Sequence, residues 1–365
     1  MSPTNTNIRI ILLVSYLVFM SSSCSDSDEK SFGPNFRNSY IYWNRSQDRV
    51  ELFAKGNRGF GEMIVYEVPQ TWYFHRGTWE KISTKETIPR DDYECVYSED
   101  VYTLYCIPLN IMRGEKVIKY PMEWSEPSAD DLDLWCREGD SWRRLKTQGL
   151  VIRNPFLSEQ RLVYSPMMQR LEWLIFDEGA IWYLSDNTWL ADKEPSLPTI
   201  FPTSNVLMDE ENQRCLVCGH PFSSSRGIEW GEHYLYEMGD DYWRVSCDLK
   251  KQAAYIEDWS LLIKDQGRNN ILLIAGTGNE EYLIAEVMGD GLTIKKSVGI
   301  PNNAFLCSIV YDCDVGRFIV LGSIQVEVNS IWRAPMRDIM WSITYSENDK
   351  AYKWEQIDWT VASSR

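Results

Sequence analysis

The sequence predicts an all-β protein, a six-bladed β-propeller of four-stranded blades. Two patterns support this prediction: a tryptophan-marked hairpin that recurs along the chain, and a second, more apolar hairpin before each of these units. A four-stranded unit of roughly 40–55 residues, repeated in tandem, is typical of propellers. Two β-sandwich domains are the alternative. They would account for the strands but not for the sixfold recurrence.

The tryptophan-marked hairpin has an aromatic residue, a short polar turn and a Trp seven positions after the first aromatic. The polar turns contain Gly, Asp, Asn and Ser, which favour tight hairpins. In a fifth unit the two Trp are thirteen apart, and a sixth unit keeps the turn but has Leu292 at the Trp position. The pairs are Trp72/Trp79, Trp135/Trp142, Trp182/Trp189, Tyr236/Trp243 and Trp341/Trp354.

The second hairpin has a polar residue at the end of one apolar run and an Arg that opens the next run five positions later. The apolar runs after the Arg fit strands that are buried between packed sheets. Residues 93–106 and 261–276 contain the same hairpin with other residues at these two positions. The pairs are Asn44/Arg49, Ser165/Arg170, Asp209/Arg214 and Asp312/Arg317.

The first of these variant hairpins contains two cysteines. A two-residue turn at Asp100 and Val101 places Cys95 directly opposite Cys106, so a cross-strand disulfide is possible. The nine cysteines include Cys24, and the remaining eight permit disulfides in an oxidising compartment.

The segment CLVCGH invites a metal or haem interpretation. It departs from the haem signature by the inserted Gly219, and strand alternation would place Cys215 and Cys218 on opposite faces. We therefore expect buried thiols here, and no metal or cofactor.

The repeat resembles the kelch family and its galactose-oxidase-like relatives. The closest unit is SIVYDCDVGRFIVLG…MWSITYS…KWEQID, and the resemblance covers about residues 38–360. The family's double glycine is single here, at Gly219, Gly276 and Gly322. The resemblance implies a propeller whose second-to-third-strand loops lie on one face, where family members bind ligands. Exported kelch-like propellers include sugar epimerases.

The first residues have the features of an export signal. Arg9 precedes an apolar run over residues 10–20, which is followed by three serines and Cys24. This end resembles the lipobox of bacterial lipoproteins, which implies lipidation of Cys24. Cleavage at Ser23 by an ordinary signal peptidase is the alternative. We predict a signal peptide over residues 1–23, an acidic, serine-rich tether over 24–37 and the propeller over 38–365.

Composition limits the function. A net charge of −16 argues against nucleic-acid binding, and 44% hydrophobic residues argue against wholesale disorder. Only three histidines are present, and we find no catalytic motif. These features favour binding over catalysis.

The predicted second-to-third-strand loops differ widely in length, as expected for a binding surface on a rigid scaffold. Loops that only cover a neighbouring blade are the alternative. Two loops, residues 221–233 and 323–338, combine aromatic and charged residues suited to sugars and carboxylates. Their candidate ligand-binding residues are Arg226, Glu229, Trp230, Glu232, His233, Trp332, Arg333 and Arg337.

We therefore expect an exported, lipid-anchored propeller that binds a glycan or protein ligand on its loop face. The alternative is a carbohydrate-active enzyme on the same face: a sugar mutarotase or epimerase, a lyase or a glycosidase. That alternative predicts that five charged residues converge at the central channel. They are Arg226, Glu229, His233, Arg333 and Arg337.

Overall fold

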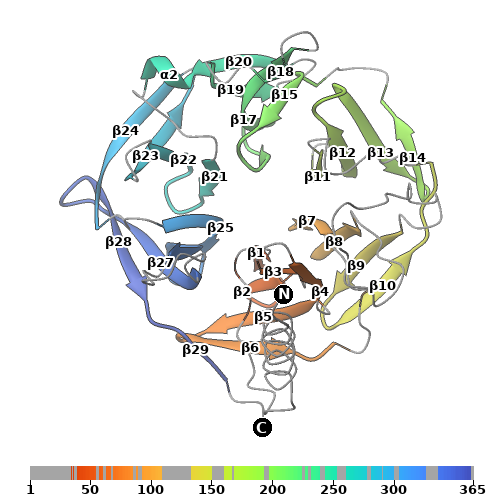
Figure 1. The fold of residues 1–365 in the computed structure, drawn as a ribbon, viewed down its shortest axis with the longest axis horizontal. Coiled ribbons are helices and arrows are strands. Elements are labelled where there is room, and N and C mark those ends of the chain that lie inside the picture. Colours follow the sequence, from red (N-terminus) through yellow and green to blue (C-terminus); the bar gives the residue numbers. More distant parts are fainter. Residues whose placement is uncertain are drawn as a thin grey trace, which may run out of the picture.

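The protein is a ring of antiparallel sheets around a central axis (Figure 1). The computed structural model describes residues 34, 36, 39–54, 57–60, 63–66, 69–84, 88, 93–108, 133–149, 160–166, 168–192, 197–223, 227–228, 232–238, 243–252, 260–277, 281–289, 291–299, 304–325 and 336–362. Within these residues the strands group into six four-stranded blades, so the predicted propeller is confirmed. The first strand of each blade lies nearest the axis and the fourth lies at the rim (Figure 1).

The first three blades are regular antiparallel sheets. Blade 1 contains β1 (Ser39–Asn44), β2 (Arg49–Ala54), β5 (Gln70–His75) and β6 (Thr78–Ile82). Blade 2 contains β7 (Tyr93–Ser98), β8 (Thr103–Pro108), β9 (Leu134–Glu138) and β10 (Ser141–Leu145). Blade 3 contains β11 (Gln160–Ser165), β12 (Arg170–Ile175), β13 (Ala180–Ser185) and β14 (Thr188–Ala191).

The inner strand of blade 4 is split in two. Blade 4 contains β15 (Ile200–Pro202) and β16 (Leu207–Asp209), which both pair with β17 (Arg214–Ser223), followed by β19 (Tyr234–Met238) and β20 (Trp243–Asp248). Blade 5 contains β21 (Ser260–Asp265), β22 (Asn270–Thr277), β23 (Glu281–Met288) and β24 (Gly291–Val298). Blade 6 contains β25 (Ala304–Asp312), β26 (Arg317–Gln325), β27 (Met336–Ser346) and β28 (Ala351–Ile357).

Five further short elements lie outside the blades. β3 (Asn57–Phe60) and β4 (Met63–Tyr66) form a separate hairpin, and β18 (Gly227–Ile228) pairs antiparallel with the end of β17. The helix α2 (Leu249–Gln252) follows β20, and β29 (Thr360–Val361) pairs with β6. No helix among the described residues is long and apolar enough to cross a membrane.

The first hairpin has the same geometry in all six blades. The predicted pairs, such as Asn44 with Arg49 and Asp209 with Arg214, face each other across a four-residue loop. The last loop residue has positive φ in each case, for example 51° at Asp48 and 70° at Gly316. In blades 1, 3, 4 and 5 the polar residue before the loop is buried and its side chain bonds to the turn, as where Asp265 Oδ1 accepts the backbone N–H of residue 267.

In blade 2 this loop spans residues 99–102, so the predicted two-residue turn at Asp100 and Val101 is wrong in length. The longer loop is symmetric about the same centre, and the register therefore still pairs Cys95 with Cys106. Both side chains are buried, and no disulfide joins them in the structure.

The tryptophans in the fourth strands of the tryptophan-marked hairpins, here called marker tryptophans, are mainly structural. Trp79, Trp142 and Trp189 each occupy the second position of a fourth strand, and none is more than 4% exposed. Blade 6 departs from the predicted alignment because its turn has four residues. Tyr352, paired with Tyr345, occupies the marker position, and Trp354 lies two residues further on.

Neighbouring blades are joined at the rim. The end of β24 in blade 5 pairs in parallel with β28 of blade 6, and Gln148 after blade 2 bridges Thr188 of blade 3. β29 makes the same kind of contact with β6 and thereby closes the ring between blades 6 and 1. At two of these contacts between blades, a glycine lies against the backbone of the next blade. Gly149 lies against Trp189, and Gly299 lies against Trp354.

We expect Gly299→Ala to lower the free energy of unfolding by about 2 kcal/mol. Gly299 has a φ of +78°, and an added Cβ would lie 2.6 Å from the carbonyl oxygen of Trp354. Gly289→Ala is the matched control, because Gly289 has a φ of +56° but nothing within 4 Å of an added Cβ. Urea denaturation should show a clearly larger loss for Gly299→Ala. Equal losses would mean that the backbone contact contributes nothing.

Candidate functional site

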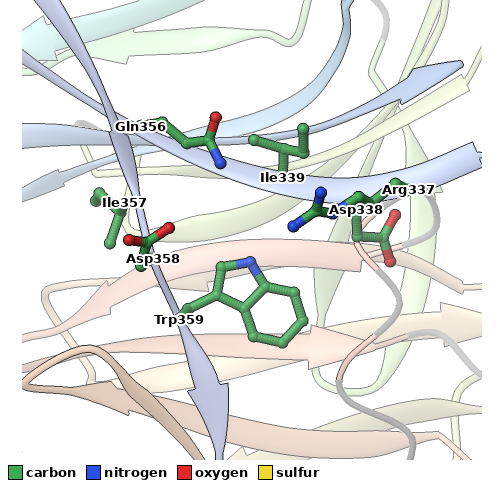
Figure 2. Close-up of a pocket in the computed structure, with 7 residues that line it drawn as sticks. All are labelled: Arg337, Asp338, Ile339, Gln356, Ile357, Asp358 and Trp359. Atoms are coloured by element: carbon green, nitrogen blue, oxygen red, sulfur yellow. The ribbon is translucent and has the colours of Figure 1, made fainter. Parts of the chain in front are cut away.

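A pocket of about 350 Å³ lies in the seam between blade 6 and the closing segment of the chain (Figure 2). It lies at the end of blade 6 that carries the second-to-third-strand loop, because β27 begins there and β28 ends there. This is the face on which the sequence predicts ligand binding. The lining residues are Arg337, Asp338, Ile339, Gln356, Ile357, Asp358 and Trp359.

Two strands and the closing segment position the lining residues. β27 supplies Arg337 and Asp338, and β28 supplies Gln356 before the chain turns into Asp358 and Trp359. Figure 2 shows the Arg337 guanidinium, the Asp358 carboxylate and the Trp359 indole around one space. The polar groups therefore all come from the β27–β28 hairpin of blade 6 and the residue that follows it.

Packing behind the pocket fixes its base. Trp359 is partly buried, and its ring centroid lies 5.1 Å from that of Phe36, which is fully buried. The backbone N–H of Phe36 donates to Asp338 Oδ2 at 3.4 Å. Phe36 also contacts Trp79 of blade 1, at 6.0 Å between ring centroids. The indole and one carboxylate are thus held by the core between blades 6 and 1.

The lining combines three kinds of recognition group. An indole face packs against the apolar face of a flat or ring-shaped ligand. The guanidinium of Arg337 donates several hydrogen bonds, while the carboxylates accept them and the Gln356 amide does both. A pocket with few polar groups converging beside an aromatic face is the usual form of a small-molecule site.

The other described candidates lie away from this pocket, in blade 4. Glu232 is exposed, whereas His233 is fully buried. His233 Nε2 is hydrogen-bonded to Thr203 Oγ1 at 2.7 Å, and its ring stacks on His220 with 4.4 Å between centroids. His220 Nδ1 is bonded to the carbonyl oxygen of Glu232. Both imidazoles therefore hold the base of the 221–233 loop, and His233 and Arg337 belong to different blades.

Several predicted site residues lie outside the described part of the chain. They are Cys24, Arg226, Glu229, Trp230, Trp332 and Arg333. Trp332 and Arg333 precede Arg337 by five and four positions in the loop that leads into β27. Their participation in a site remains a prediction.

Sequence reasoning identified Arg337 but missed Gln356, Asp358 and Trp359. Gln356 lies within the last marker strand, and Asp358 and Trp359 follow it, where a repeat-based prediction assigns no loop. The available signal was the Trp-Thr-Val run at 359–361 after the sixth unit. Such a run after a complete set of blades indicates a further strand that closes the ring.

Comparison with known proteins finds only weak likenesses to solved structures. No family model and no curated protein matches the sequence. A SapL1 lectin in complex with alpha methyl fucoside is 9% identical, covers 91% of this chain and 98% of its own, and has a TM-score of 0.49. A fungal lectin from Aleuria aurantia, a six-bladed β-propeller, is 9% identical over 89% and 96%, with a TM-score of 0.48. The periplasmic gluconolactonase of Pseudomonas aeruginosa is 12% identical over 88% and 86%, with a TM-score of 0.45. At these values the likeness carries no argument about ligand or activity.

Proposed function

We propose that this propeller binds a neutral saccharide in the pocket between blade 6 and the closing segment, which we call the seam pocket. The observation that supports this proposal is the lining, where the Trp359 indole stands beside Arg337, Asp358 and Gln356. Sugar rings present C–H groups on one face and hydroxyls at the edge. The indole accommodates the first and the charged and amide groups accommodate the second.

The charges in the lining favour a neutral ligand over an acidic one. Two carboxylates, Asp338 and Asp358, stand against the single guanidinium of Arg337. An anionic sugar would gain one ion pair but would face two like charges, whereas hydroxyls can donate to both carboxylates. The volume of about 350 Å³ is at the lower end of the range for small-molecule pockets, which suits one or two sugar units.

We expect Arg337→Ala to weaken binding of the best neutral saccharide at least about tenfold, because its guanidinium is an exposed donor in the lining. A glycan array identifies the ligand, and isothermal titration calorimetry measures each variant. Arg143→Ala is the control, since Arg143 is exposed and pairs only at the surface of blade 2 with Glu138. No binding to any neutral glycan, or equal losses in both variants, would contradict the proposed function.

Export and lipid anchoring at Cys24 belong to the same proposal and rest on residues 1–24. The Cys95–Cys106 register supports a disulfide that would form in an oxidising compartment. Intact-mass measurement of material purified from the producing cell should show an acylated Cys24. Non-reducing peptide mapping should show a linked Cys95–Cys106 peptide. An unmodified N-terminus and two alkylatable thiols would contradict both expectations.

A further inference from the structure

The six first-hairpin loops meet around the axis at the end of the ring opposite the seam pocket. We call this surface the axial mouth, formed by residues 45–48, 99–102, 166, 168–169, 210–213, 266–269 and 313–316. Direct contacts join neighbouring loops. Arg45 lies 3.9 Å from Glu99, and the Cys313 thiol donates to Gln266 Oε1 at 3.0 Å. These contacts join the loops of blades 1 and 2 and the loops of blades 5 and 6.

Large apolar side chains are exposed on this surface. Val101, Tyr102, Met168 and Val315 are 46–59% exposed, and all four lie on the loops of the axial mouth. Tight turns ordinarily carry small or polar residues at such positions. Apolar side chains gathered at exposed loop tips are typical of a surface that contacts a partner.

The same loops carry a strong excess of negative charge. Their described residues include two guanidiniums, one of which, Arg268, is already occupied: it binds Glu286 at 2.6 Å and lies 3.7 Å from the centre of the Tyr345 ring. Arg45 is the other, beside Glu99. The carboxylates are Asp48, Glu99, Asp100, Glu210, Glu211 and Asp314.

These carboxylates repel one another. Burial raises the pKa of Glu99, and the neighbouring charge of Glu210 raises it further. Burial likewise raises the pKa of Glu210, with Asp100 adding to the effect. Lys264 of blade 5 pairs with Glu211 of the mouth and with Asp209. Among the described residues, the remaining carboxylates of the mouth therefore still outnumber the cations beside them.

We propose that the axial mouth docks a basic segment of a partner protein that also carries apolar side chains. Cations of the partner would satisfy the carboxylates, and its apolar side chains would cover Val101, Met168 and Val315. Nucleic acid and anionic lipid are disfavoured by the same charge. The mouth and the seam pocket lie on opposite faces, so this proposal stands independently of saccharide binding.

The test is binding of a fluorescein-labelled peptide of about 12 residues with four lysines and three leucines, followed by fluorescence anisotropy at low and at physiological salt. Two reference peptides replace the lysines by glutamates or the leucines by serines. We expect the Lys/Leu peptide to bind at least about tenfold tighter than either reference. Hydrogen exchange should slow in residues 99–102, 210–213 and 313–316.

Matched variants separate the mouth from the overall acidity of the chain. Glu99→Gln with Glu210→Gln, and separately Met168→Ser with Val315→Ser, should each weaken binding about tenfold. Glu347→Gln with Glu355→Gln is the control, because both residues are exposed on blade 6 and the net charge changes equally. This control should stay within about twofold of the parent. Equal weakening by both charge variants, equal binding of the leucine-free peptide, or no binding at low salt would overturn the proposal.

Discussion

Glu51→Gln is expected to lower the free energy of unfolding by about 3–5 kcal/mol, because it breaks a fully buried ion pair. Glu51 of β2 is inaccessible to solvent, and its Oε2 lies 2.6 Å from Arg137 Nη1 of β9. The Tyr42 hydroxyl donates to the same oxygen at 2.7 Å, and Arg49 reaches the other oxygen at 2.7 Å. The cluster links blade 1 to blade 2.

The loss of stability in Glu51→Gln should be large because the Arg137 guanidinium remains buried without its partner charge. Arg137 is 3% exposed, and its Nε and Nη2 atoms have no hydrogen-bond partner among the described residues. Without the charge of Glu51, this guanidinium stays buried and poorly compensated. Denaturant unfolding of Glu51→Gln, Arg137→Met and the double variant forms a thermodynamic cycle. The double variant should be less destabilised than the sum of the single variants.

The surface pair Arg143–Glu138 in the same blade is the control for the ion pair. Its side chains are 64% and 60% exposed at 3.0 Å, so Glu138→Gln should cost less than about 1 kcal/mol. Similar losses for Glu51→Gln and Glu138→Gln would contradict the assignment of the buried pair as a main inter-blade contact.

The buried Glu51–Arg137 pair predicts a contribution to stability that depends on pH. Burial by itself would raise the pKa of Glu51, but the charge and hydrogen bond of Arg137 outweigh it and hold the pKa below the usual 4.5. A carboxylate with a lowered pKa in the folded state stabilises the protein above its unfolded pKa and loses that contribution as the pH falls. The stability difference between the parent and Glu51→Gln should therefore shrink below about pH 4.5.

The fold could be predicted from the sequence because its determinants are local and repeated. The Asn44/Arg49 type of spacing and the Trp79 type of hairpin each report on a few consecutive residues, and six repetitions made the propeller evident. The errors were also local. A four-residue turn in blade 6 moved the marker position from Trp354 to Tyr352, and the loop at 99–102 was taken as two residues.

The candidate site was only partly predictable because ring closure positions Trp359. Arg337 could be identified because it lies in a predicted loop of unusual composition. Trp359 packs against Phe36 only when the chain end returns to blade 1, whose Trp79 precedes it by 280 residues in the sequence. The Glu51–Arg137 pair was missed because its two residues come from different blades and neither stands out within its own strand.

Thr360→Pro tests this dependence of the pocket on closure, and it should lower the free energy of unfolding by about 3 kcal/mol. The Thr360 backbone N–H donates to the Gly77 carbonyl at 3.0 Å, and proline has no such donor. The next residue, Val361, pairs with Trp79 and packs against the core between blades 6 and 1. A displaced β29 would therefore also disturb that core.

The same variant should weaken saccharide binding, because Trp359 directly precedes Thr360 and lines the pocket. Thr360→Ala is the matched control, since it keeps the backbone donor and removes only the side-chain methyl and the hydroxyl that lies 3.3 Å from the Thr78 hydroxyl. Calorimetric unfolding and saccharide titration should both change for the proline variant and stay near the parent values for the alanine variant. If Thr360→Pro bound saccharide normally while losing stability, the pocket would be independent of closure. If it lost neither, the blades would be held together without β29, and the pocket would not depend on the pairing of β29 with β6.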